Sequence, residues 1–216
     1  MAPFKRRGAF VVIEGLDGAG KTSNIRNLGN YFSHSDTPHF MASEYDDSKV
    51  CLALRTMLNN QAPDFNVMTE TMMFYASRIE HTQKIIAPYL DGGTHVITDR
   101  YYATTLAYQG VKNPKVREVH ELAQPHLREP DLILFYDIPG DVYEARVLMR
   151  GKGLDAIESR GRPYFEQVRA NFLKLAENDP RYLIIDATKP LEDVFTETIA
   201  RVDAFLRTFN EDVVAS

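Results

Sequence analysis

A glycine-rich loop directly after the first apolar run limits what this chain can fold into. Residues 15–22 read GLDGAGKT and match the pattern GxxxxGK[ST]. The apolar run at residues 9–13 predicts a buried strand before the loop, and residues 21–31 predict a helix after it. Glycines let the backbone N–H groups of such a loop turn inward around phosphate oxygens, and the helix adds the positive end of its dipole. The sequence therefore predicts a strand, a phosphate-binding loop and a helix.

Two side chains of this phosphate loop (residues 15–22) have specific roles in the motif. Lys21 is expected to bridge the terminal phosphates of a nucleoside triphosphate, and Thr22 is expected to reach a Mg²⁺ ion. The predicted nucleotide-binding set within the loop is Gly15, Gly18, Ala19, Gly20, Lys21 and Thr22.

The remaining apolar runs indicate an α/β fold. Runs at residues 95–98, 132–138 and 182–185, and a weaker one at 38–42, read as continuous apolar segments, which are typical of strands buried on both faces. Such strands predict a parallel sheet with helices on both faces. Helices are predicted at residues 21–31, 49–58, 69–89 (stopped near Pro88), 116–123, 142–150, 163–177 and 191–209.

Length and composition favour a single domain in a reducing compartment. With 216 residues and no linker-like tract, we expect one domain over residues 1–216. The single Cys51 cannot form an internal disulfide, and no apolar run approaches the ~20 residues that span a bilayer. The basic start runs straight into the first strand and is too short for a signal-peptide core. We therefore expect a cytoplasmic protein without a membrane partner, and the net charge of −5 argues against a nucleic-acid partner.

A carboxylate and a guanidinium follow the run at residues 95–98. No guanine-reading NKxD-type segment follows a later strand, which argues against a GTPase. Asp99 is well placed for Mg²⁺, and the adjacent Arg100 suits a second phosphate group, because ligands of α/β sheets bind at the carboxyl ends of the strands. Taken alone, the two residues also fit a structural ion pair.

Several motifs together resemble the thymidylate kinases, and most closely the bacterial-type enzymes. They are the phosphate loop, MFYASR at 73–78, DRY at 99–101, AYQG at 107–110 and DAT at 186–188, in the order and spacing of that family. The resemblance implies phosphorylation of dTMP to dTDP by ATP with Mg²⁺, a five-stranded parallel sheet with a mobile lid, and a homodimer.

The resemblance also implies roles for the acceptor nucleotide. Phe74 and Arg78 are four residues apart and share one helix face, so the ring can stack on a pyrimidine while the guanidinium meets its carbonyl edge. Thr105 matches a position that hydrogen-bonds thymine, and Tyr108 one that crowds the 2′ side of the sugar. Asp17 matches a carboxylate that accepts from the 3′-hydroxyl. Arg100 would hold the monophosphate.

The chain departs from the family after its second strand. Where the family often has Arg-Glu-Pro, with the arginine on the acceptor phosphate, this chain reads Ser43-Glu44-Tyr45. Losing a charged hydrogen bond would cost about 1.5 to 3 kcal/mol of binding unless Tyr45 or another arginine supplies a contact. Glu44 could instead act as a base on a 5′-hydroxyl. A kinase with an altered acceptor therefore stays open as an alternative: dUMP, another pyrimidine deoxymonophosphate or a deoxynucleoside.

The donor side is assigned to a lid at about residues 146–160. Arg150 matches the family's lid arginine, which would deliver a cation to the transferring phosphoryl group when the lid closes. Arg146 and Thr188 are expected to contact ATP. The predicted catalytic residues are then Lys21, Asp99, Arg100 and Arg150. A nucleotide-binding switch or inactive scaffold is disfavoured because Lys21, Thr22, Asp99 and Arg150 are all present.

Overall fold

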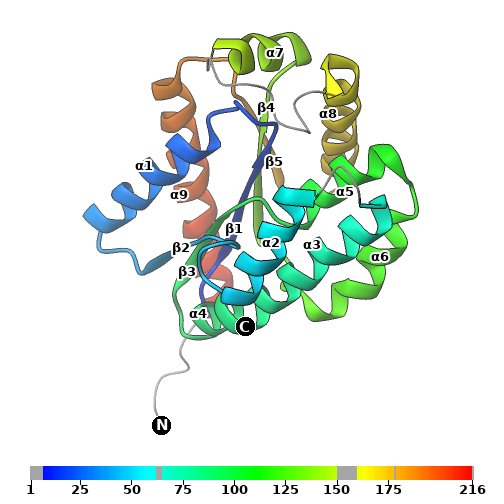
Figure 1. Ribbon diagram of the computed structural model, residues 1–216. Coiled ribbons are helices and arrows are strands. Elements are labelled where there is room, and N and C mark those ends of the chain that lie inside the picture. Colours follow the sequence, from blue (N-terminus) through cyan, green and yellow to red (C-terminus); the bar gives the residue numbers. More distant parts are fainter. Residues whose placement is uncertain (1–6, 62–64, 150–159, 178, 216) are drawn as a thin grey trace.

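The five apolar runs form one sheet in the computed structural model, which describes residues 7–61, 65–149, 160–177 and 179–215. The strand order is β2-β3-β1-β4-β5, and every neighbouring pair is parallel (Figure 1). The strands are β1 (Phe10–Gly15), β2 (His39–Ala42), β3 (His95–Asp99), β4 (Leu132–Asp137) and β5 (Tyr182–Asp186). Since β1 is central, the loop that follows it lies in the middle of the sheet's carboxyl edge.

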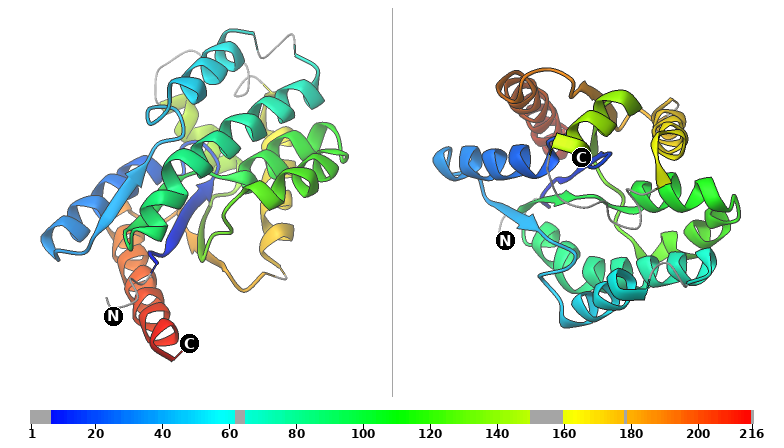
Figure 2. Two further views of the ribbon diagram at one scale, coloured as in Figure 1. Left: turned by 90° about the horizontal axis from the view of Figure 1, so that it is seen from below. Right: turned by 45° about the horizontal axis from the view of Figure 1, so that its top comes forward.

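Helices cover both faces of the sheet, as Figure 2 shows. They are α1 (Lys21–His34), α2 (Lys49–Gln61), α3 (Val67–His81), α4 (Ala87–Asp91), α5 (Tyr102–Lys112), α6 (Val116–Ala123), α7 (Gly140–Met149), α8 (Arg162–Ala176) and α9 (Leu191–Ala215). On one face α1 and α9 pack together, and on the other α4, α5 and α8 contact the strands.

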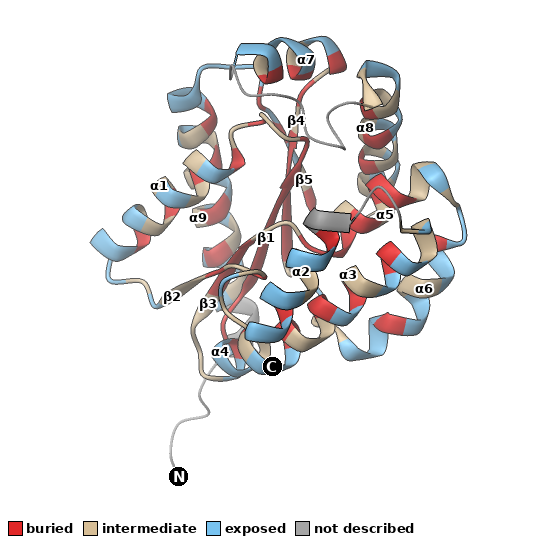
Figure 3. Cartoon of the chain, in the orientation of Figure 1, coloured by how far each residue is buried: buried red, intermediate tan, exposed pale blue. Residues whose placement is uncertain are grey.

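Burial follows this layering. All residues of β1 and nearly all of β4 are buried, and these strands form the red centre of Figure 3, while the outer sides of the helices are exposed. The predicted α/β class, with its five parallel strands and helices on both faces, is confirmed. Within the described ranges, the structure has no helix with both the length and the apolar character needed to cross a membrane.

The helix predicted at residues 69–89 is present, and its helical path ends at Asp91, three residues after Pro88. Helix α3 continues through a π-helical segment (Thr82–Ile86) into α4, and Pro88 lies in the first turn of α4. The wider π turn is closed by a bond from the Ala87 N–H to the Thr82 carbonyl. A proline in the first turn of a helix loses no required donor, so the helical path passes through it to Asp91.

Helix α5 was not among the predicted helices. Its N-cap residue, Tyr101, offers no side-chain cap. The cap comes instead from Glu14 on β1, whose carboxylate accepts from the backbone N–H groups of Tyr101 (2.8 Å) and Thr104 (3.3 Å) and from the Thr104 hydroxyl. Glu14 is fully buried, and burial raises the pKa of this carboxyl. A distant residue thus fixes the start of α5 and the chain just before it.

We expect Gly8→Ala to destabilise the fold by about 3 kcal/mol, because overpacking against backbone has no cheap relief. A Cβ at Gly8 would lie 1.9 Å from the carbonyl oxygen of Thr94, just before β3. The matched control is Gly110→Ala in α5, where the nearest atom to an added Cβ is a side-chain nitrogen 3.8 Å away. That change should be neutral or stabilise by up to about 1 kcal/mol. Urea unfolding of both variants checks this, and equal midpoints would contradict it.

Candidate active site

The phosphate loop folds around the ammonium group of Lys21. Three of its glycines have positive φ angles, 144° at Gly15, 78° at Gly18 and 85° at Gly20, which side chains rarely adopt. Lys21 opens α1 and is 5% exposed, and its Nζ donates to the carbonyls of Gly15 (3.1 Å) and Leu16 (2.9 Å). The loop therefore has the backbone shape that the motif predicts for a phosphate cradle.

The electrostatics of Lys21 suit an anionic ligand. Burial, and next the positive charge of Arg100, lower the pKa of Lys21 to about 8. Nearby carboxylates oppose this shift only in part. A buried ammonium that has no salt bridge within the described residues is stabilised when phosphate oxygens reach it.

The predicted Mg²⁺ ligands lie at the end of β3 and the start of α1. Asp99 ends β3 and pairs in register with Ile13 of β1, and its Oδ1 is buried without a hydrogen-bond partner in the described structure. Thr22 is exposed on the first turn of α1. Mg²⁺ in kinases keeps several waters and takes one or two carboxylates plus phosphate oxygens. A carboxylate with one buried oxygen that makes no hydrogen bond in the described structure fits that need. The described residues contain no cluster of three or more acidic, histidine or cysteine ligands.

Arg100 is held in an unusual backbone conformation. Its φ is 67°, in the left-handed region that non-glycine residues seldom adopt, and its N–H donates to the carbonyl of Ile13 (2.9 Å). The guanidinium donates to the Gly15 carbonyl (3.0 Å), the Thr104 hydroxyl (3.2 Å) and Asp17 Oδ1 (2.6 Å). Burial alone would lower the pKa of Arg100, but Asp17 and other anionic neighbours raise it. The side chain is thus a fixed cation between the phosphate loop and α5.

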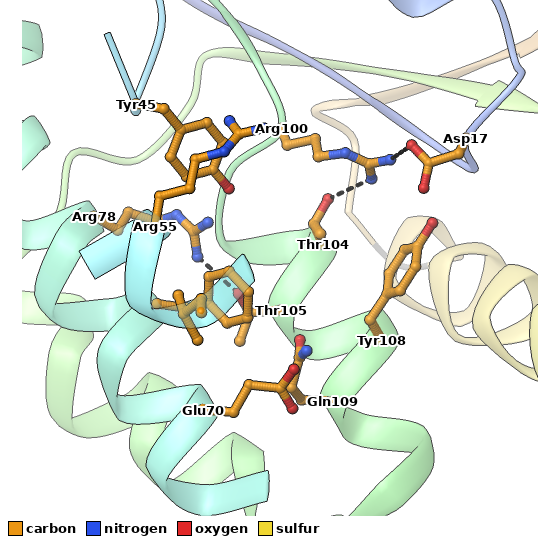
Figure 4. Close-up of a pocket in the computed structure, with 12 residues that line it drawn as sticks. Asp17, Tyr45, Arg55, Glu70, Arg78, Arg100, Thr104, Thr105, Tyr108 and Gln109 are labelled. Atoms are coloured by element: carbon orange, nitrogen blue, oxygen red, sulfur yellow. Dashed lines mark hydrogen bonds and ion pairs between the residues drawn. The ribbon is translucent and has the colours of Figure 1, made fainter. Parts of the chain in front are cut away.

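A pocket opens between this cation and helices α2, α3 and α5 (Figure 4). We call it the acceptor pocket. It is lined by Asp17, Tyr45, Arg55, Leu58, Glu70, Phe74, Arg78, Arg100, Thr104, Thr105, Tyr108 and Gln109. All of the predicted substrate-binding residues are therefore brought together here.

Arg78 is the most constrained side chain of the pocket. It is 2% exposed, and its guanidinium donates to Thr105 Oγ1 (2.8 Å) and to Glu44 Oε2 (3.2 Å). Phe74, one helical turn earlier on α3, is half-buried and lines the same pocket. The ring and the guanidinium therefore lie side by side, as the four-residue spacing predicts.

Sequence reasoning missed several lining residues. Arg55 on α2, Glu70 on α3 and Gln109 on α5 all line the pocket. Glu70 accepts from Lys112 Nζ (3.1 Å) and is 1% exposed. Gln109 lies within the AYQG motif, so the motif pointed to it, whereas nothing near Arg55 in the sequence separates it from an ordinary helix-surface arginine.

On the donor side, Arg146 joins two segments. Its guanidinium donates to the carbonyl of Gly18 in the phosphate loop (3.0 Å) and to that of Ala187 after β5 (2.9 Å). Thr188 follows Ala187, and its N–H and hydroxyl both donate to Asp186 Oδ1. Arg146 and Thr188, the two ATP contacts predicted outside the phosphate loop, therefore lie beside it. Arg150 and most of the predicted lid lie outside the described residues.

Comparison with known proteins agrees with this geometry. The sequence model of the family described as Thymidylate kinase matches residues 13–198. A thymidylate kinase of Carboxydothermus hydrogenoformans is 33% identical over 208 residues, covering 94% of this chain and 99% of the relative. One of Pseudomonas fluorescens is 36% identical over 195 residues, covering 87% and 91%. This chain therefore belongs to the thymidylate kinase family.

Proposed function

We propose that the protein transfers the γ-phosphoryl group of ATP to dTMP, giving dTDP and ADP in deoxynucleotide synthesis. The observation that carries this proposal is the acceptor pocket. Arg100 and Asp17 stand at the end next to the phosphate loop, and the Phe74–Arg78 pair lies deeper, beside Thr105. A pyrimidine nucleotide stacked on Phe74 with its phosphate at Arg100 would present that phosphate to the ATP site.

The transfer needs no general base, because the attacking oxygen already belongs to an anionic phosphate. Positioning and charge neutralisation then supply the rate. In this proposal Lys21 holds the terminal phosphates of ATP, while Arg100 and Arg55 hold the acceptor phosphate. Thr22 and Asp99 would hold Mg²⁺, which when bound neutralises charge on the donor phosphates. Arg150 would add a lid cation.

The deoxynucleoside-kinase alternative requires Glu44 as a base, and its surroundings argue against that role. Glu44 is 6% exposed, does not line the acceptor pocket, and is engaged by Arg78. Its other oxygen, Oε1, makes no hydrogen bond in the described structure but is buried away from the pocket. Protonation of this carboxylate would also remove the charge that compensates the buried guanidinium of Arg78.

Release of ADP from Mg·ATP tests the proposal when dTMP, dUMP, dGMP and thymidine are offered separately at equal concentration. We expect dTMP to be the best acceptor. If turnover with dUMP is close to turnover with dTMP, the enzyme accepts more than one pyrimidine deoxymonophosphate. Turnover with thymidine and none with dTMP would overturn the proposal and restore Glu44 as base.

We expect ATP to bind with uptake of a proton by Lys21 at about pH 9, because the phosphates raise the lowered pKa of this buried ammonium. Near pH 7 Lys21 is already protonated, so the uptake should vanish. Calorimetry in two buffers of different ionisation enthalpy measures it, and the Lys21→Met variant is the control. Equal uptake by the variant would assign the proton to another group.

Three further properties concern the whole chain: its domain organisation, its location and its oligomeric state. We propose one domain over residues 1–216 with a lid at about 146–160, a cytoplasmic location and a homodimer. Exposed apolar side chains support an assembly surface: Met72 on α3 (56% exposed) and Leu122 on the neighbouring α6 (78% exposed).

We expect Leu122→Asp to shift the protein from a dimeric to a monomeric mass in light scattering, because a charge in an apolar interface is costly. Leu148→Asp, another exposed leucine but on α7, is the control. A monomeric parent would contradict the proposed dimer.

A further inference from the structure

The segment between β2 and α2, where the family's arginine is missing, is tied down on both sides of Tyr45. Before it, the Ser43 hydroxyl donates to Asp46 (2.6 Å) and the Ser43 N–H to Asp47 (2.7 Å). After it, the same Asp47 oxygen contacts His81 of α3 (2.9 Å), which is 1% exposed. The serine hydroxyl is therefore occupied within its own turn and does not replace the lost cation.

Glu44 fixes the segment from the inside. Its carboxylate pairs with Arg78 at 3.2 Å, and both side chains are buried. With Ser43, Glu44 and Asp47 all anchored, the backbone that carries Tyr45 is held in place without a ligand.

The Tyr45 ring is stacked against the guanidinium of Arg55. The guanidinium carbon of Arg55 lies 3.7 Å from the centre of the ring, within the range of a cation–π contact. Figure 4 shows the Arg55 side chain extending from α2 across the Tyr45 ring. Both residues line the acceptor pocket, and Arg55 makes no salt bridge within the described residues. Stacking uses the flat face of the guanidinium and leaves its N–H edge for an anion.

We propose that Tyr45 is a positioning residue: its ring holds Arg55 in place as the second cation for the acceptor phosphate, in addition to Arg100. This inference rests on the proposed function and deepens it. A free arginine loses side-chain entropy when it grips a phosphate, and a stacked one has lost much of it already. The ring thus takes part in binding the phosphate without touching it.

The test compares a ligand that has the phosphate with one that lacks it. Binding of dTMP and of thymidine is measured by calorimetry for the parent, Tyr45→Phe, Tyr45→Leu, Arg55→Met and the double variant Tyr45→Leu/Arg55→Met. We expect Tyr45→Leu to raise the Kd of dTMP about tenfold and to leave that of thymidine nearly unchanged. Tyr45→Phe keeps the ring and should bind both ligands as the parent does. Tyr89→Leu is the matched control, since Tyr89 stacks on Phe40 at 4.0 Å outside the pocket.

The double variant separates positioning from a structural role. If Tyr45 acts through Arg55, then Tyr45→Leu adds nothing to the effect of Arg55→Met on dTMP. Fully additive effects would overturn the proposal, and so would an equal loss of thymidine binding. A loss in Tyr45→Phe as large as in Tyr45→Leu would assign the contact to the hydroxyl instead. A parent that binds thymidine but not dTMP would refute the proposed function itself, before any variant is compared.

Discussion

Replacing Arg100 with methionine should lower kcat/KM for dTMP by about 10³-fold, the size of effect seen when a preorganised charge is removed from a transition state. The guanidinium is fixed by three acceptors, Gly15, Thr104 and Asp17. Its loss would remove a cation from the acceptor phosphate and leave Asp17 next to two anionic nucleotides without this partner. Both consequences should weaken binding and slow transfer. Steady-state kinetics with each substrate varied in turn gives the measurement.

The control for this variant is Arg117→Met. Arg117 is exposed on α6 and does not line the acceptor pocket. Its replacement removes the same charge and should leave kcat/KM within about twofold, because distant exposed charges are screened by salt. An Arg100→Met enzyme within tenfold of the parent would show that the acceptor phosphate is bound elsewhere.

Prediction from the sequence succeeded where a local pattern alone determines the structure. The phosphate loop and the strands around it were predictable because glycine spacing and continuous apolar runs are local signals. Phe74 and Arg78 were also placed on one face by their spacing alone. In each case the relevant contacts lie within one element or between adjacent ones.

Prediction failed where a distant residue decides the local structure. Helix α5 lacks a cap of its own and begins where Glu14 supplies one from β1, 87 residues earlier in the chain. Arg55 belongs to the site only because the anchored turn at Tyr45 meets α2. Neither the cap from Glu14 nor the contact between Tyr45 and Arg55 can be inferred from the neighbouring sequence.

The buried pair beneath the acceptor pocket should make Arg78 important for stability as well as for substrate. Arg78 and Glu44 have side chains 3% and 6% exposed, and each is the other's charge partner. Removing one partner of a buried pair leaves an uncompensated charge, which typically costs about 3 to 5 kcal/mol. We therefore expect Arg78→Met to lower the free energy of unfolding by about 3 kcal/mol and to abolish measurable dTMP turnover.

The double variant Arg78→Met/Glu44→Gln distinguishes the two roles of the arginine. Because the glutamine carries no charge, it should restore most of the lost stability. Turnover should stay absent, since the guanidinium that meets the base edge is still missing. Urea unfolding and ADP release on the same preparations test both halves. If stability is not recovered, the cost of Arg78→Met lies in packing and in the lost bond to Thr105 instead of the orphaned carboxylate. If turnover returns with stability, Arg78 supports the fold of the pocket without binding the base.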